Sequence, residues 1–256
     1  MNPLISIVVV TYLESNQKYL DLCLKSIDNL SIPKEDYEVI LVSSGEYVPN
    51  KNPIVKEYMH SQGRLHYPEA INWGITHTNP ESKYLLILND DVILTKDSLA
   101  NMVNVVQDMD VIAGPISNCD NHTKYGLIFG YMKDDVYQHV NKRFYRYEEW
   151  PDHEQMMNMI SQYPPGMFPQ QFLCFYCTLI PRKVWNKIGT LDGKFKTGQD
   201  DLDYSKRCLQ QNITPIVVLN SLVWHFGGVS ADQALTNEIR LENVKYYREK
   251  WGENPL

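Results

Sequence analysis

Residues 85–94 read LLILNDDVIL: an apolar run, the polar triplet Asn89-Asp90-Asp91, and a second apolar run. The first run is typical of a buried β-strand. An ionised carboxylate at the end of such a strand is costly to desolvate unless a cation or a hydrogen-bond donor accompanies it. Two acids in this place suit a hard divalent cation, which takes oxygen ligands. A turn or a helix cap is the alternative, because Asp is common at both.

Strand and helix patterns alternate on both sides of this stretch. Residues 5–12, ISIVVVTY, form a β-branched run typical of a strand covered on both faces, and apolar residues recur at helical spacing in 19–30. Alternation over residues 1–116 predicts an α/β fold with a mostly parallel sheet flanked by helices. The predicted strands are 5–12, 37–45, 84–88, 110–116, 171–180, 214–219 and 221–226, and the predicted helices are 19–30, 68–78, 95–109, 182–189, 200–212 and 234–252.

The pattern weakens in residues 117–168, which are rich in Tyr, Asn, Asp, Met and Pro. We expect excursions or short antiparallel strands over a site, and no separate domain. No internal repeat or low-complexity linker interrupts the chain. The sequence therefore predicts one domain over residues 1–256.

Bulk properties exclude several classes of protein. The 256 residues carry a net charge of −7, which weighs against broad binding to nucleic acid or anionic membranes. No apolar stretch approaches the roughly 20 residues of a membrane span, and the N-terminus lacks the pattern of a signal peptide. An odd number of scattered cysteines, Cys23, Cys119, Cys174, Cys177 and Cys208, predicts reduced thiols in a cytoplasmic protein. No second Cys/His pair follows Cys174 and Cys177 at zinc spacing.

Polar residues follow the predicted parallel strands. Thr11-Tyr12, Ser43-Ser44 and Asn89-Asp90-Asp91 end three of them. In an open parallel sheet, ligands bind outside the carboxyl ends of the strands. The sequence predicts a binding site at this edge.

Two further groups carry titratable side chains. Asp200, Asp201 and Asp203 crowd one helix start, where they either cap the helix dipole or supply a general base. His225 follows an apolar strand and precedes two glycines, as a buried core histidine or a metal ligand. Imidazole beside carboxylate favours Mn²⁺ somewhat over Mg²⁺. The chain lacks the Gly-rich motifs of NAD and P-loop sites and the nucleophile elbow of α/β-hydrolases.

The order of these motifs resembles the family 2 glycosyltransferases with the GT-A fold. The succession ISIVVVTYLES, YEVILVSSG, PEAINWGI, YLLILNDDVIL, GQDDLDYSKR and VWHFGG carries the resemblance, which covers about residues 4–116 and 171–252. It implies a single Rossmann-like GT-A domain with a smaller antiparallel element. Residues 1–116 would form the half that binds the nucleotide sugar, and residues 117–256 the acceptor half with a C-terminal helix.

The resemblance also implies a donor site. Thr11, Tyr12 and Glu14 correspond to the nucleotide pocket, and Asn72 to a segment that lines it. Ser43 and Ser44 replace an Asp-Asn-Gly-Ser stretch that contacts the base and ribose, which leaves the nucleobase open, with a UDP-sugar as the expected donor.

The acids and the histidine receive roles by the same resemblance. Asn89, Asp90 and Asp91 correspond to the Asp-x-Asp motif, with Asp91 as the expected ligand of Mn²⁺ or Mg²⁺. His225 completes the metal site. Asp201 is the expected catalytic base, with Asp200 as the second choice.

The implied function is that of an inverting, metal-dependent glycosyltransferase that moves a sugar from a nucleotide sugar to an acceptor hydroxyl. The acceptor stays open between a glycan, a glycoconjugate, another hydroxyl and, less favoured, a modified DNA base. A catalytically degenerate nucleotide-sugar-binding protein and a nucleotidyltransferase are the alternatives. Aromatic residues of the middle segment either stack on a ligand or only bury apolar area: Tyr125, Phe129, Tyr131, Tyr145, Tyr147 and Trp150.

Overall fold

The computed structural model describes residues 3–117, 166–227 and 233–255. Within them, nine strands form one sheet in the order β3-β2-β1-β4-β8-β6-β9-β5, with β7 paired to β9. The strands are β1 (Ile5–Thr11), β2 (Tyr37–Ser44), β3 (Glu57–Ser61), β4 (Tyr84–Asn89), β5 (Val92–Leu94), β6 (Val111–Ser117), β7 (Met167–Pro169), β8 (Cys177–Pro181) and β9 (Thr214–His225).

The sheet is parallel in its first half and mixed in its second. Strands β3, β2, β1 and β4 run parallel to one another, whereas β8 is antiparallel to both β4 and β6. Strand β9 runs parallel to β6 and antiparallel to β5 and β7. The prediction of an α/β domain with a mostly parallel sheet and a smaller antiparallel element is confirmed.

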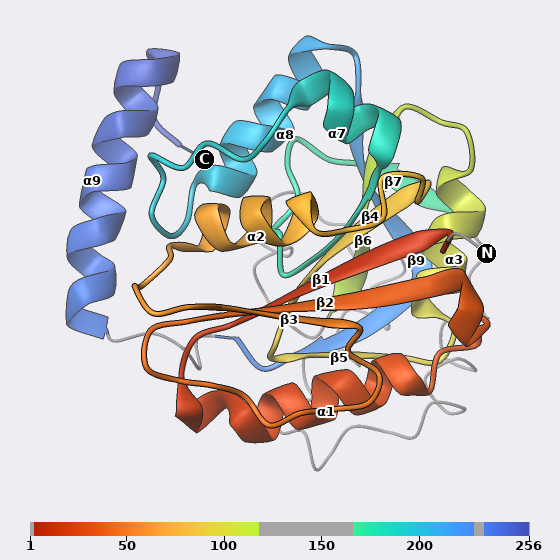
Figure 1. Ribbon diagram of the computed structural model, residues 1–256. Coiled ribbons are helices and arrows are strands. Elements are labelled where there is room, and N and C mark those ends of the chain that lie inside the picture. Colours follow the sequence, from red (N-terminus) through yellow and green to blue (C-terminus); the bar gives the residue numbers. More distant parts are fainter. Residues whose placement is uncertain (1–2, 118–165, 228–232, 256) are drawn as a thin grey trace, which may run out of the picture.

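Helices cover both faces of the sheet (Figure 1). Apolar residues of α1 and α3 pack on one face, and those of α2, α7 and α8 on the other. Helix α9 lies at the edge of the second layer, beside α8 (Figure 1). The helices are α1 (Gln17–Asp28), α2 (Tyr67–Thr76), α3 (Ser98–Val106), α7 (Arg182–Ile188), α8 (Asp200–Gln210) and α9 (Gln233–Trp251), with 3₁₀ turns η1 (Glu14–Asn16) and η2 (Lys34–Asp36).

The alternation of side chains along β1 explains why its whole sequence is apolar. Ile5, Ile7 and Val9 contribute to the core under α1, and Val8 contributes to the core under α2. A strand buried on both faces leaves no position for a polar side chain until it ends. No helix in the described part of the chain is both long and apolar enough to cross a membrane.

Two strand predictions are wrong. The predicted strand 171–180 is reduced to β8, because the backbone before Cys177 bonds to other groups: the Leu173 N–H donates to the Ser205 hydroxyl at 3.2 Å. The predicted strands 214–219 and 221–226 are one strand, β9. Its register against β6 shifts after Pro115. The polar residue Asn220 lies inside this strand, and its carbonyl accepts a hydrogen bond from Asn101 Nδ2 of α3.

Candidate active site

The carboxyl ends of three parallel strands bring the predicted donor-site residues to one edge of the sheet. Thr11 of β1 is paired with Ser43 of β2, and Val10 is paired with Asn89 of β4. Asp90 and Asp91 follow immediately. The polar residues thus lie where the apolar strands end, as the sequence predicted.

Asp90 is tied to the end of the first strand. Its Oδ2 accepts hydrogen bonds from Thr11 Oγ1 at 2.6 Å and Asn16 Nδ2 at 3.2 Å. Burial raises the pKa of Asp90 to about 7, opposed by the Thr11 bond and reinforced by the charge of Asp91. Ionisation of this side chain is therefore unfavourable unless positive charge is nearby.

Asp91 and His225 face each other across the pairing of β5 with β9. The Gly227 N–H donates to Asp91 Oδ2 at 3.1 Å, and the Phe226 N–H donates to the Asp91 carbonyl at 3.0 Å. The other carboxylate oxygen, Oδ1, is buried, accepts no hydrogen bond within the described residues, and lies 3.3 Å from His225 Nε2. The ring of Tyr176 stacks on the imidazole, with centroids 4.4 Å apart.

This pair fits a divalent cation. A buried carboxylate oxygen without a hydrogen bond, next to an imidazole nitrogen, is the oxygen–nitrogen donor set that Mn²⁺ accepts. The amide oxygen of Asn89, two residues earlier, is likewise buried without a hydrogen bond within the described part. Across residues 3–117, 166–227 and 233–255, no three His, Cys, Asp or Glu side chains are grouped to hold a metal by themselves. A cation on Asp91 and His225 would thus need further ligands, which a diphosphate and water can supply.

The acid pair Asp200-Asp201 opens helix α8. Asp200 Oδ1 accepts the Gly198 N–H at 3.0 Å, and Asp201 Oδ1 accepts its neighbour's N–H, from Leu202, at 2.8 Å. Burial raises the pKa of both carboxyls, and the charge of Asp201 raises that of Asp200 further. The N–H groups of Leu202 and Phe175 oppose the rise in the pKa of Asp201. Hydrogen bonds from the backbone therefore favour the ionised form of Asp201, against the effect of burial.

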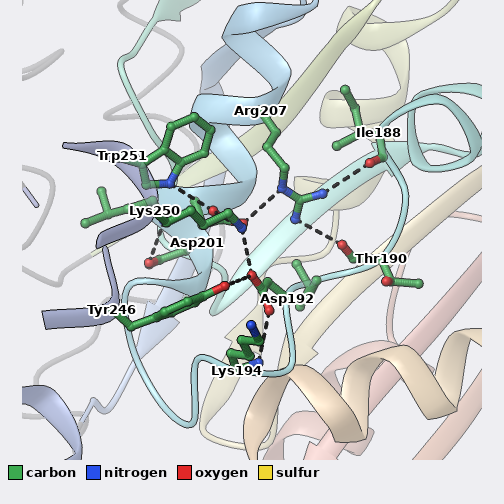
Figure 2. A network of polar contacts seen from close by, with 12 residues as sticks. Ile188, Thr190, Asp192, Lys194, Asp201, Arg207, Tyr246, Lys250 and Trp251 are labelled. Carbon is green, nitrogen blue, oxygen red and sulfur yellow. Dashed lines mark hydrogen bonds and ion pairs between the residues drawn. The ribbon is translucent and has the colours of Figure 1, made fainter. Parts of the chain in front are cut away.

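Asp203, the third acid of this helix start, is separate from the pair. Its Oδ2 accepts from Arg207 Nε at 2.9 Å, and its Oδ1 accepts from Trp251 Nε1 at 3.0 Å and lies 2.7 Å from Lys250 Nζ. Figure 2 shows how Lys250 also reaches Asp192, at 2.7 Å. Asp203 is fully buried, and its partners join the end of α9 to α8. Its role is structural.

Tyr67 responds electrostatically to both acid groups. This side chain begins α2, and its hydroxyl donates to the Phe175 carbonyl. Burial raises its pKa well above the usual value, and the charges of Asp200, Asp201 and Asp91 add to that rise.

Sequence reasoning missed Tyr67. It lies one residue before Pro68, at the predicted start of a helix, and no periodicity distinguishes it from a core tyrosine. The sequence offers only one sign of it, an aromatic residue directly before a predicted helix. That sign is too weak to identify a site.

The remaining predicted residues have varied surroundings. The Arg64 guanidinium lies 4.7 Å from the centre of the Tyr12 ring, and Ser43 Oγ lies 2.9 Å from His60 Nδ1. Ser44 is buried at the end of β2, and Glu14 is exposed on η1. Asn72 Nδ2 donates to the Leu191 carbonyl at 2.8 Å, and Asn72 Oδ1 accepts the Leu191 N–H at 3.0 Å. The Asn72 amide therefore joins α2 to the segment before α8, and its second N–H and second oxygen lone pair remain for a further bond.

The prediction for the aromatic residues of the middle segment is not tested. All six, from Tyr125 to Trp150, lie outside the described residues.

The comparisons with known proteins show the family and the fold. The model of the family described as "Glycosyl transferase family 2" matches residues 6–189. No match was found among proteins with curated descriptions. Many solved structures resemble the fold, and two of them, both at a sequence identity too low to carry function, illustrate it.

The first is the mannosyltransferase PcManGT from Pyrobaculum calidifontis in complex with GDP-Man and Mn²⁺, at 14% identity and a TM-score of 0.63. The alignment covers 99% of this chain and 66% of that one. The second is GalNAc-T7 with UDP, GalNAc and Mn²⁺, at 12% identity and a TM-score of 0.61, covering 88% of this chain and 44% of that one. This chain thus spans a little under two thirds of the first protein and less than half of the second. Both structures are GT-A glycosyltransferases, so the predicted GT-A fold is confirmed.

Proposed function

The chain belongs to glycosyl transferase family 2, and from that premise we propose that it is an inverting, metal-dependent enzyme that transfers a sugar from a nucleoside diphosphate sugar to an acceptor hydroxyl. The observation that carries this proposal is that two acid groups, in different segments of the chain, have different surroundings. Asp91 keeps one carboxylate oxygen without a hydrogen bond next to His225, and Asp201, in another segment, accepts the Leu202 N–H at 2.8 Å at the start of α8.

The donor side of the site follows from the strand ends. Thr11, Tyr12, Glu14, Ser43 and Ser44 would hold the nucleoside, and Asn89 and Asp90 the region next to the diphosphate. Asn72 would line the same site. A UDP-sugar is the first donor to test, with GDP-mannose beside it, because Ser-Ser-Gly at residues 43–45 leaves the nucleobase open.

Asp91 and His225 would hold the cation, Mn²⁺ in preference to Mg²⁺. When bound there, a divalent cation neutralises the charge that develops on the departing diphosphate. Gly227 contributes by occupying Asp91 Oδ2 with its N–H, which leaves Oδ1 facing the imidazole.

Asp201 would accept the proton of the attacking hydroxyl. The Leu202 N–H, which donates to Asp201 Oδ1 at 2.8 Å, favours its ionised form. A single displacement needs one base on the face opposite the leaving group and inverts the anomeric carbon. The half of the chain after residue 116, which contains this acid, would bind the acceptor.

Release of nucleoside diphosphate from UDP-sugars and GDP-mannose tests the proposal, with water or an added sugar as the acceptor. We expect activity with Mn²⁺, and a fall in kcat/KM of about 100-fold or more in Asp91→Asn and Asp201→Asn. Asp108→Asn is the matched control, since Asp108 is exposed and pairs with Lys83.

Activity that persists in excess chelator would contradict the proposed dependence on a cation. Full activity of Asp201→Asn would contradict the proposed role of Asp201 as the base. Retention of the anomeric configuration in the product would exclude the single displacement.

A further inference from the structure

The turn that leads into α8, residues 196–199, is held by one side chain from the middle of α9. Asn243 Oδ1 accepts the Lys196 N–H at 3.2 Å, and Asn243 Nδ2 donates to the carbonyl oxygens of Thr197 and Gly198, both at 2.8 Å. Asn243 is buried, with 1% of its surface exposed. One amide group therefore bonds three consecutive residues of the turn away from water.

The backbone of this turn has two left-handed residues in succession. Gly198 has a φ of +87° and Gln199 a φ of +65°. Glycine adopts this region readily, whereas a residue with a side chain does so at a cost in free energy. A Cβ at Gly198 would meet no atom within 4 Å, so glycine is needed there for its conformation and not for space. The side chain of Gln199, the N-cap of α8, makes no capping hydrogen bond that would offset its cost. The hydrogen bonds from Asn243 therefore stabilise a conformation that the turn alone would not favour.

The same turn is bonded directly to the acid pair. The Gly198 N–H donates to Asp200 Oδ1 at 3.0 Å, while the Gly198 carbonyl accepts the hydrogen bond from α9. The Gln199 carbonyl accepts the Asp203 N–H at 2.9 Å, which is the hydrogen bond that begins α8. Asp201 lies between these two contacts in the sequence, so the direction of its carboxylate depends on how the helix begins.

We propose that Asn243 is a positioning residue for the acid pair Asp200-Asp201: it fixes the left-handed turn before α8, and through Gly198 it fixes the direction in which the helix presents the two carboxylates. The proposal rests on the proposed function only where one of these acids is the catalytic base. The hydrogen bonds themselves belong to the folded chain without substrate.

Another contact of α9 provides the matched control. Tyr246, one turn further along the helix, donates from its hydroxyl to Asp192 Oδ2 at 2.8 Å (Figure 2). This bond also joins α9 to the segment before α8, but it does not involve the turn. Tyr246→Phe therefore weakens the attachment of α9 and leaves the hydrogen bonds of Asn243 in place.

The test variant is Asn243→Asp, which keeps the size of the side chain. Its carboxylate can still accept the Lys196 N–H, but an oxygen replaces the donor Nδ2. The carbonyl oxygens of Thr197 and Gly198 then lose their donor and face a negative charge. This variant therefore removes the bonds that hold the left-handed residues, without leaving a cavity.

Amide NMR of the substrate-free protein measures the state of the turn. In Asn243→Asp, we expect the Gly198 amide proton signal to move upfield, because its hydrogen bond to Asp200 weakens. The Asp203 amide should exchange with solvent about 10-fold faster or more, because the first hydrogen bond of α8 opens more often. Tyr246→Phe should leave both signals close to those of the wild type.

Turnover measures whether the turn positions the acids. Asn243→Asp should lower kcat about 10-fold or more and leave the KM for the donor unchanged, because the donor residues lie at the strand ends and not in the turn. Tyr246→Phe should keep kcat within about twofold of the wild type.

Gln199→Gly gives a test by rescue. Glycine adopts the left-handed conformation without the help of Asn243, so the double variant Gln199→Gly, Asn243→Asp should recover part of the lost kcat. A general loss of α9 packing would not be repaired by glycine at residue 199. If Asn243→Asp does not fold, Gly198→Ala replaces it, since a Cβ there meets no atom but disfavours the φ of +87°. It should produce the same two amide changes and the same fall in kcat.

Three results would overturn the proposal. The first is an unchanged Gly198 signal and Asp203 exchange rate in the test variant, and the second is an equal change in Tyr246→Phe. The third is a wild-type kcat in a variant whose amide signals show that the turn has changed. A changed turn in a protein without turnover on any donor would keep the positioning of the two carboxylates and contradict only the proposed function.

Discussion

Asp90 and Asp91 are neighbours in sequence, yet their carboxylates have different surroundings. Asp90 Oδ2 accepts from Thr11 and Asn16, whereas Asp91 Oδ1 lies beside His225 without a hydrogen bond in the described part of the chain. The first arrangement fixes the strand end, and the second suits a cation. The two acids that the sequence presents as one motif therefore have different surroundings: Asp90 is held by hydrogen bonds, and Asp91 is the one that we propose as a cation ligand.

Asp90→Asn should stabilise the cation-free protein at alkaline pH. The folded pKa of about 7 lies above the unfolded value near 3.9, so the folded state binds more protons between these values and the ionised carboxylate costs stability above them. We expect the free energy of unfolding at pH 8 to rise by about 1–3 kcal/mol in the variant. The difference should vanish as the pH falls to about 4.

Urea denaturation at pH 4, 6 and 8 measures this effect. A variant that is less stable at pH 8, or whose stability gain is the same at every pH, would contradict the assigned environment of Asp90.

At the scale of elements, α2 covers β1 and β2, and its first residue, Tyr67, donates to the Phe175 carbonyl. Its close approach to the sheet depends on Gly74, where a Cβ would lie 2.5 Å from Val8 Cγ1 and 2.9 Å from Val42 Cγ2. Those methyl groups belong to β-branched side chains in the core and cannot move freely. The position of Tyr67 therefore follows from the packing at the opposite end of its helix.

Gly74→Ala should lower the free energy of unfolding by about 1–3 kcal/mol, because overpacking displaces the helix from the sheet. Gly63→Ala is the control, as a Cβ there meets nothing within 4 Å. Chemical denaturation of both variants gives the comparison. Equal stability of the two would show that α2 is not held as closely as described.

Helix α9 is held against α8 by the contacts of Asp203 with Lys250 and Trp251. Removing one partner of a buried ion pair leaves the others without compensation, which is strongly destabilising. Because Lys250 and Arg207 are partly exposed, we expect Asp203→Asn to cost about 2–3 kcal/mol and to increase amide exchange in α9. Glu242→Gln, which breaks the exposed pair with Lys196, should cost about 0.5 kcal/mol or less. Slow exchange of α9 in the Asp203 variant would contradict this role.

At the scale of the whole molecule, the sequence predicted what is periodic or buried. The alternation of apolar strands with amphipathic helices yielded β1, β2, β4, β6 and the helices to within a few residues, and the order of the motifs identified the family. Strands β3, β5 and β7 were missed, because β5 and β7 have three residues each and β3 is only partly buried. Short runs carry no measurable alternation.

The site was predictable to the same extent. The positions of Thr11, Ser43 and Asn89 at the sheet edge could be predicted because these residues end buried strands, where a polar residue is conspicuous. The contact between Tyr67 and Phe175 could not, since 108 residues separate the phenol from the carbonyl it binds. The distinction between Asp201 and Asp203, identical side chains in one helix, likewise depends on which partners tertiary packing brings.

The central claim is that a cation on Asp91 and His225 lies close to Asp201, and paramagnetic broadening by Mn²⁺ measures this directly. The probe is protein labelled at the aspartate carboxyl carbons, with UDP present and Mg²⁺ as the diamagnetic reference. Asp108 provides an internal standard, because it pairs with Lys83 at the start of β4, about 20 Å along that strand from Asp91. We predict that Mn²⁺ broadens the Asp201 signal and leaves Asp108 sharp, and that Asp91→Ala abolishes the broadening. A sharp Asp201 signal in the wild type with Mn²⁺ bound, or broadening that survives the loss of Asp91, would contradict the account.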